Sequence, residues 1–259
     1  MNTKRTGMAR VSLLVITLNE EDNISGCIAS VPGAGEVVVI DSFSSDRTAE
    51  IAEAEGAAVY KREFISYSDQ KNWGMGRCTG EWILILDADE RLSSSLVEEI
   101  AVSVEDPDAA GFFLRRRSEF LGRRIRFCGW DRDRVLRLFR NGKGHYPERA
   151  VHEKLELDGS PGTLKGWVYH NPYRDLGDYL ERMKSYSRLG AEEAGRRGRR
   201  WFPALILNPP ARFIRMYLLQ LGFLDGIAGL ILCSLASTQV FLKYSFLREI
   251  YRDSRKRAK

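Results

Sequence analysis

Three short, mostly apolar runs, each followed directly by a cluster of carboxylates and hydroxyls, constrain the fold of this chain more than any other feature. The runs cover residues 11–16, 37–40 and 82–86, and the polar clusters cover residues 17–22, 41–46 and 87–90. A continuous apolar run between polar residues is typical of a strand that is buried on both faces of a sheet. The sequence therefore predicts three central strands that each end in polar side chains.

The stretches between these runs have the composition of helices. Residues 47–55 follow Asp46, a suitable N-cap, and stop at Gly56. Residues 23–30 and 67–78 also fit helices, and residues 57–61 fit a further short strand. Alternating strands and helices predict an α/β fold with a right-handed, mostly parallel sheet. The three polar clusters would then lie at the carboxyl edge of that sheet, where open α/β sheets bind their ligands.

Asp87 and Asp89 come directly after the most apolar of these runs. Two carboxylates at such an edge are suited to holding Mg²⁺ or Mn²⁺ on a diphosphate, because both ions prefer oxygen ligands. The alternative is that Asp87 caps the next helix and that Asp89 is solvated. The recurrence of acidic clusters after all three runs favours a ligand-binding edge.

The order and spacing of four short motifs give the chain a resemblance to a known family. These motifs are TLNEED at 17–22, WILILDADE at 82–90, LDG at 224–226 and KY at 243–244. With them the chain resembles the inverting, GT-A type glycosyltransferases of family 2, and among these the bacterial lipopolysaccharide-core glucosyltransferases. The resemblance implies a Rossmann-like nucleotide-sugar-binding and catalytic domain over residues 8–172. Residues 173–259 would form a basic, amphipathic helical region close to a membrane.

The resemblance also implies roles for individual residues that contact a UDP-sugar donor. Asp41 would accept a hydrogen bond from the uracil ring, Asp87 would contact the ribose or the metal, and Asp89 would be the direct metal ligand. The remaining contacts to base and ribose would come from the first loop, at Thr17, Asn19 and Glu20.

Three further side chains are candidates for the donor or acceptor phosphates and sugars. Lys71 lies in a predicted helix start and would supply a point charge to phosphate, or it would be a solvated helix lysine. Trp130 could stack on a sugar face, and Arg137 could bind the diphosphate or acceptor phosphates. The alternative for Arg137 is an arginine on the exposed face of a strand over residues 135–139.

Inversion at the sugar carbon requires a general base for the acceptor hydroxyl. No Glu-Asp pair stands at a convincing position after Asp89, so the segment from Glu148 to Glu153 is the best source of the base. Glu153 is the first choice and Glu148 the second, since a carboxylate is ionised at pH 7 without special tuning. His152 would complete the metal sphere or contact diphosphate, or it would be a structural histidine.

Charge and cysteine content indicate where the protein acts. The four cysteines are far apart and show no metal-binding spacing, which predicts free thiols in the cytoplasm. From residue 190 onward the chain has 13 Lys/Arg and 5 Asp/Glu, a net charge of +8. Basic residues beside aromatic and apolar stretches predict peripheral docking on the anionic inner face of the inner membrane. The apolar stretch 227–242 is short of the ~20 residues that a spanning helix needs.

Two other functional classes fit parts of the sequence. A Mg²⁺-dependent phosphotransferase or phosphatase could use Asp87 as nucleophile, but its Asp-x-Asp should follow the first strand. A basic, non-enzymatic membrane or nucleic-acid adaptor leaves the acidic edge unexplained, and acidic clefts repel polyanions, so no nucleic-acid partner is expected. The resemblance favours transfer of glucose from UDP-glucose to a heptose of a lipopolysaccharide core.

Overall fold

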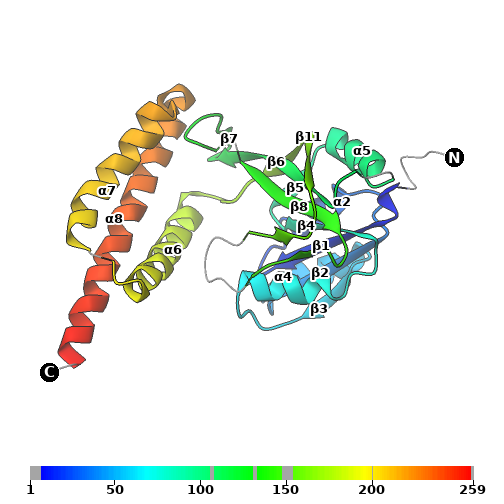
Figure 1. Cartoon of the computed structure of the whole chain (residues 1–259), viewed down its shortest axis with the longest axis horizontal. Helices are drawn as coiled ribbons and strands as arrows, with labels where there is room; N and C mark the ends of the chain where they lie inside the picture. Colours follow the sequence, from blue (N-terminus) through cyan, green and yellow to red (C-terminus); the bar gives the residue numbers. More distant parts are fainter. Residues whose placement is uncertain (1–6, 106–107, 131–132, 148–153, 200, 258–259) are drawn as a thin grey trace. The chain divides into compact units, whose positions relative to one another are not determined.

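The computed structural model describes residues 7–105, 108–130, 133–147, 154–199 and 201–257 of the chain. It divides into two compact units, whose elements are labelled in Figure 1. The first unit comprises Met1–Arg117 and Arg132–His170, and the second comprises Ser118–Asp131 and Asn171–Lys259. The segment that begins at Ser118 therefore belongs to the same unit as the C-terminal helices, although its first residues continue a strand of the main sheet.

Four parallel strands form one half of the main sheet, in the order β3 (Ala58–Lys61), β2 (Glu36–Asp41), β1 (Val11–Thr17) and β4 (Trp82–Asp87). The chain moves outward from β1 to β3 and then returns to the other side of β1 to form β4. The strand order reverses at this point, which is where doubly wound sheets open a crevice for ligands. This half confirms the predicted α/β fold.

The other half of the sheet is mainly antiparallel, which the sequence patterns did not predict. It continues from β4 through β8 (Arg134–Arg140), β6 (Gly111–Phe120), β11 (Pro161–His170) and β5 (Glu90–Leu92). β8 is antiparallel to both β4 and β6, and β11 is antiparallel to β5. β7 (Arg123–Arg124) pairs with β6, while β9 (Gly144–His145) and β10 (Glu156–Leu157) form a separate two-stranded sheet.

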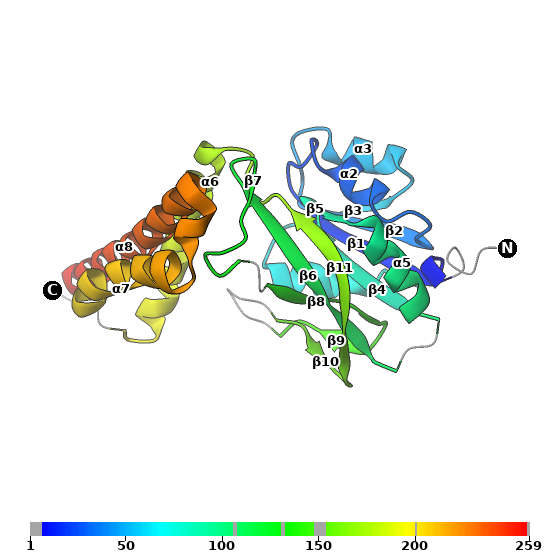
Figure 2. The ribbon, with the colours of Figure 1, turned by 90° about the horizontal axis from the view of Figure 1, so that it is seen from above.

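Helices cover both faces of the parallel half (Figure 2), and alternate strand residues serve the two cores. Leu13 and Leu84 point to the core that contains α2 (Ile24–Ala29), α3 (Thr48–Ala54) and α5 (Ser94–Ser103). Leu14 and Ile85 point to the opposite core, against which Trp73 of α4 (Tyr67–Met75) packs. Because both faces are covered, the strands are apolar without alternation, as the sequence predicted.

The second unit is a helical assembly of α6 (Leu176–Arg196), α7 (Phe202–Ile214) and α8 (Gly226–Arg257), with a short π-helix (Arg215–Leu219) and 3₁₀ helix (Gly222–Asp225) between α7 and α8. α8 packs against both α6 and α7. The carboxylate of Asp225 accepts hydrogen bonds from the backbone N–H groups of Arg126 and Phe127, at 3.0 and 2.9 Å. The LDG motif thus ties the segment 118–131 to the start of α8.

α8 is longer than the apolar stretch in the sequence suggested. Among the described residues, the segment Gly222–Ser254 is long and apolar enough to cross a membrane by length and composition. This corrects the expectation that the segment is too short to span. The same helix also has a packed face, since Leu232, Ala236 and Leu247 are buried. All four cysteines are buried free thiols.

Candidate active site

The carboxylate of Asp87, at the end of β4, is held by two cationic side chains. Its Oδ2 lies 2.6 Å from Nη2 of Arg137, and its Oδ1 lies 3.9 Å from Nζ of Lys71. Both cations are buried, with 7 % of each residue exposed. The alternatives of a solvated lysine and of a solvent-facing arginine at these positions are therefore wrong. Asp87 is the anchor of a charged cluster at the carboxyl edge of the sheet.

β8 contains one extra residue relative to β6 at Arg137. Phe112 of β6 lies opposite Leu138, but the next residue, Phe113, lies opposite Leu136, so Arg137 has no partner on β6. Such a bulge bends the strand and redirects a side chain, and bulges are common beside active sites. The bulge lies beside the ion pair with Asp87, and regular alternation from Leu138 and Phe139 places Arg137 on the same face as Ile85 and Asp87.

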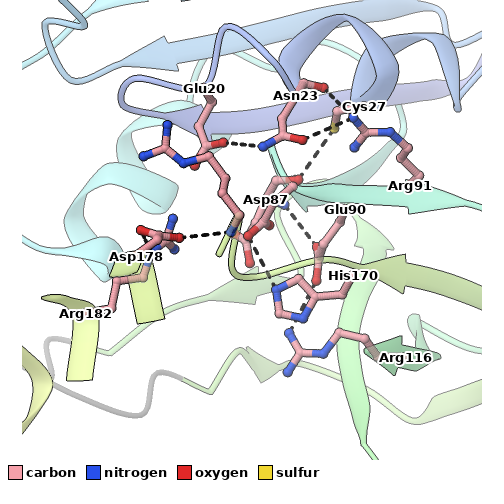
Figure 3. Close-up of polar contacts among 12 residues, drawn as sticks. Glu20, Asn23, Cys27, Asp87, Glu90, Arg91, Arg116, His170, Asp178 and Arg182 are labelled. Atoms are coloured by element: carbon pink, nitrogen blue, oxygen red, sulfur yellow. Dashed lines mark hydrogen bonds and ion pairs between the residues drawn. The ribbon is translucent and has the colours of Figure 1, made fainter. Parts of the chain in front are cut away.

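Glu90 also contacts this cluster, and its role was not identified from the sequence. Its side chain is fully buried, and Oε2 accepts a hydrogen bond of 3.0 Å from the backbone N–H of Asp87. Its Oε1 lies 3.3 Å from Nη1 of Arg116 (Figure 3), and its Oε2 lies 3.8 Å from Nη2 of Arg137. A buried carboxylate needs such partners because an unpaired charge is costly in the interior. The fourth residue of the DADE sequence is therefore a structural part of the motif.

The electrostatic balance keeps Asp87 ionised. Burial raises the pKa of the Asp87 carboxyl, but the positive charges of Arg137 and Lys71 outweigh this effect and lower the pKa well below its usual range. Burial likewise lowers the pKa of Arg137, and the charges of Asp87 and Glu90 outweigh it and raise that pKa well above its usual value. The site therefore presents a fixed ion pair at neutral pH.

Asp89 points to a different partner from Asp87. Its Oδ2 lies 3.6 Å from Nε2 of His170, the last residue of β11. Its Oδ1 is buried and has no hydrogen-bond partner in the part of the chain that the structure describes. His170 was not identified from the sequence, because it is a single histidine at the end of a strand and far from the Asp-x-Asp in the chain. Strand pairing brings it there, with His170 opposite Glu90.

The pair formed by Asp89 and His170 fits one side of a divalent metal ion. A buried carboxylate oxygen without a hydrogen-bond partner destabilises the folded state, and a bound cation would remove this cost. The described residues contain no group of three or more His, Cys, Asp or Glu that could hold a metal. Mg²⁺ is commonly held by one or two protein carboxylates plus phosphate oxygens of the substrate. Two protein ligands with a diphosphate are thus a sufficient set.

The loops after β1 and β2 are joined side by side at the same edge. The backbone N–H of Asn19 donates to Ser44 Oγ at 2.9 Å, and Asn19 Oδ1 accepts from the N–H of Ser45 at 2.8 Å. Asn19 has a positive φ of 55°, which asparagine tolerates better than most residues. The carboxylate of Asp41 is buried and accepts hydrogen bonds from the backbone N–H and hydroxyl of Ser44. Asn19 and Asp41 shape these loops, whatever further contacts they make.

Other residues of these loops leave polar atoms available to a ligand. Thr17 Oγ1 and Gln70 Oε1 are buried and have no hydrogen-bond partner among the described residues. Gln70 Nε2 donates to Ser42 Oγ at 2.9 Å, which places the start of α4 against the loop after β2. Glu20 accepts a hydrogen bond of 2.7 Å from Asn23 Nδ2.

The stacking of Trp130 on a sugar stays a prediction. Trp130 belongs to the second unit, where it packs edge to face against Phe120 at a centroid distance of 6.4 Å. Its ring is part of the packing of that unit, which sequence reasoning could not anticipate. The proposed base Glu153, the alternative Glu148 and the proposed ligand His152 lie outside the described residues.

Comparisons with known proteins agree with this geometry. Over 91% of its length the chain is 29% identical to a lipopolysaccharide core biosynthesis glycosyltransferase, LpsC, of Rhizobium meliloti, of which 93% is covered. It is 24% identical over 96% of its length to an uncharacterised glycosyltransferase of Rickettsia typhi, of which 90% is covered. The crystal structure of S. aureus TarS 1-349 has the same fold, with a TM-score of 0.50 and 15% identity over 94% of this chain and 91% of that one.

The family model "Glycosyl transferase family 2" matches residues 12–155, which is more than half of the 259 residues. The match includes all three loops at the carboxyl edge and the Asp87–Arg137 pair. It supports a transferase in place of the phosphatase and adaptor interpretations. The chain therefore belongs to glycosyltransferase family 2.

Proposed function

We propose that this enzyme transfers glucose from UDP-glucose, with inversion, to a sugar hydroxyl of a lipopolysaccharide core. The observation that carries the proposal is the buried, unsatisfied oxygen of Asp89 beside His170, at the edge where three polar loops meet. The similarity to LpsC supports a lipopolysaccharide-core acceptor. In this proposal residues 8–172 bind the donor and residues 173–259 serve the acceptor side.

Different residues at the carboxyl edge would bind different parts of the donor. Asp41 and the loop from Thr17 to Glu20 would hold uracil and ribose, and Thr17 Oγ1 offers an unsatisfied hydrogen-bonding atom for this purpose. Asp89 and His170 would hold Mg²⁺ or Mn²⁺ on the diphosphate. The metal, when bound, would stabilise the negative charge that develops on the departing UDP.

Asp87 has a supporting role in this arrangement. Both of its oxygens already face cations, Arg137 and Lys71, so it is a poorer metal ligand than Asp89. Its ion pairs fix the end of β4 and therefore the backbone from which Asp89 extends. Lys71 lies 5.3 Å from the ring of Tyr146 and is held in place by that contact as well.

The acceptor hydroxyl must lose a proton as it attacks the sugar carbon. We propose Glu153 as the general base, with Glu148 as the alternative, because each carries an ionised carboxylate at neutral pH. Attack from the side opposite to UDP inverts the configuration at the sugar carbon. His152, between these two residues in the sequence, would complete the metal sphere or contact the diphosphate.

Two measurements test the donor side and the acceptor side separately. UDP with Mn²⁺ should raise the melting temperature of the wild-type enzyme, because a ligand that binds the native state stabilises it. The Asp89→Asn variant should show no metal-dependent increase. Transfer is then measured with a panel of labelled nucleotide sugars and heptose-terminated core acceptors. Binding of UDP without transfer from UDP-glucose would reject the donor assignment but retain the nucleotide site.

We further propose that the second unit docks on the anionic inner face of the inner membrane. Exposed apolar side chains recur every four residues along α7 and the turn after it, at Phe202, Ile206, Pro210, Ile214 and Leu218. Residues 194–224 contain six arginines and no Asp or Glu. An apolar helix face flanked by arginines is the pattern of a helix that lies in the membrane interface.

The membrane proposal predicts binding to vesicles that depends on both charge and apolar insertion. Each arginine near an anionic surface contributes about 1 kcal/mol, so binding to phosphatidylglycerol vesicles should weaken, without vanishing, as salt is raised. Replacing Ile206 and Ile214 with Ser should abolish the salt-resistant part. Extraction of the wild-type protein only by detergent, and not by salt or carbonate, would instead identify α8 as a spanning helix.

A further inference from the structure

A cluster of arginines around Trp167 lies outside the donor site. Arg115 and Arg117 of β6 have guanidinium carbons 4.0 and 3.6 Å from the centroid of the Trp167 indole. Two guanidinium groups at these distances cannot share one side of the ring, so the indole lies between them. Side chains two residues apart on a strand are about 6.8 Å apart, which matches this sandwich. The stacking orients both guanidinium groups and reduces their freedom before any ligand arrives.

A third arginine lies on the strand next to this cluster. Arg134 of β8 lies directly opposite Arg115 in the antiparallel pairing of the two strands. Like charges in directly opposed positions destabilise a sheet. Among the described residues, neither Arg115 nor Arg134 forms an ion pair with a carboxylate. Arg116, which points to the opposite face of β6, forms ion pairs with Asp133 and Glu90. An anion would convert this repulsion into attraction.

The cluster lies on the sheet face from which Asp87 extends. Leu114 and its partner Val135 contact the core on the α2 and α5 side, so their neighbours Arg115 and Arg134 point to the other face. Asp87 follows Ile85 at a spacing of two, and Ile85 belongs to the core on that same other face. β6 and β11, which carry the cluster, are neighbouring strands with their ends at the carboxyl edge (Figure 2).

We propose that Arg115, Arg117 and Arg134, with Trp167 as a positioning residue, bind a phosphate group carried by the glycan acceptor. This inference rests on the proposed function and extends it, since it names phosphate as the group by which the acceptor is recognised. Planar guanidinium groups bind phosphate oxygens through paired hydrogen bonds, and preorganised arginines do so most effectively. The acceptor would then be positioned with its phosphate on this cluster and its hydroxyl toward the donor site.

The test measures binding, so it does not depend on turnover. The probe is a heptose-terminated core oligosaccharide freed of lipid, compared with the same material after removal of its phosphates with aqueous hydrogen fluoride. Calorimetry in the presence of UDP should show that the wild-type protein binds the phosphorylated form about tenfold or more tighter. The Arg115→Gln/Arg134→Gln variant should bind both forms with the weaker affinity.

A matched control removes the same charge elsewhere. Arg47 and Lys143 are exposed and each forms a surface ion pair, with Glu50 and Asp158 respectively. The Arg47→Gln/Lys143→Gln variant should retain the full preference for the phosphorylated form. Circular dichroism verifies the fold of each variant, and Arg134→Gln alone, at an exposed position, gives a second test if the double variant does not fold.

Three outcomes would overturn the inference. The first is equal wild-type affinity for the two oligosaccharides, and the second is a variant that loses affinity equally for both. The third is loss of binding to phosphatidylglycerol vesicles by the same variant without any effect on the oligosaccharide, which would assign the cluster to a lipid headgroup. Phosphate-dependent binding without transfer from any nucleotide sugar would reject the proposed function and leave this inference standing.

Discussion

Replacing Arg137 with Gln should destabilise the protein more than any loss of a surface charge. Removal of one partner from a buried ion pair costs about 3–5 kcal/mol, because the other charge is left without compensation. Two carboxylates lose a partner here, but each keeps one cation: Asp87 keeps Lys71 at 3.9 Å, and Glu90 keeps Arg116 at 3.3 Å. We therefore expect a loss near the lower limit, about 3 kcal/mol.

The loss can be measured by urea denaturation at pH 7 and by thermal unfolding, where about 3 kcal/mol corresponds to a fall of roughly 6–12 °C in the melting temperature. Lys143→Gln is the control, since its ion pair with Asp158 is exposed and should contribute less than about 1 kcal/mol. The Arg137→Gln/Asp87→Asn variant should recover part of the stability, because it removes the uncompensated charge. The reasoning is refuted if Arg137→Gln lowers the free energy of unfolding no more than Lys143→Gln does. It is also refuted if adding Asp87→Asn lowers the free energy of unfolding further.

Asp89→Asn should abolish transfer and the Mn²⁺-dependent binding of UDP, while thermal unfolding shows a melting temperature within a few degrees of wild type; near-normal turnover that resists chelators would contradict the metal role. Glu153→Gln should reduce kcat by about 10²–10⁴ with UDP binding intact, and the same profile in Glu148→Gln alone would reassign the base. Burial raises the pKa of Glu36, but the hydrogen bonds that its carboxylate accepts outweigh this effect and lower it. Its stabilisation is therefore present above the unfolded pKa of about 4.3 and lost as the pH falls toward the folded pKa. Glu36→Gln should cost about 1–2 kcal/mol at pH 7, and urea denaturation should show that the cost shrinks below about pH 4; a cost that is constant with pH would refute the assignment.

The parallel half of the fold could be predicted because its strands are buried on both faces. A run such as Trp82–Asp87 carries enough apolar residues to be identified without knowledge of its neighbours. The antiparallel half could not be predicted in the same way. Its strands β6 and β11 have polar residues on one face and pair with partners far away in the sequence, so that only the folded chain reveals which strands lie side by side.

The candidate site likewise combines residues with a local sequence signal and residues that only the fold brings together. Asp87 and Asp89 were identified because they follow a recognisable strand, but their different surroundings depend on residues from other strands. His170 and Arg116 come from β11 and β6, and neither carries a local signal. Trp130 packs against Phe120 in the second unit, a contact that its neighbours in sequence do not reveal.

The extra residue in β8 has a consequence for engineering this enzyme. Because the bulge at Arg137 shifts the alternation by one, Leu138 and Val135 face the same core although they are three residues apart. Deleting one residue at the bulge would restore a regular strand, and Val135 and Arg134 would keep their faces because the pairs on both sides of the bulge keep their register. Deletion of Leu136 would retain the Arg137–Asp87 ion pair, whereas deletion of Arg137 would remove it. A single-residue deletion at this point is therefore compatible with the orientation of the arginine at the proposed acceptor site.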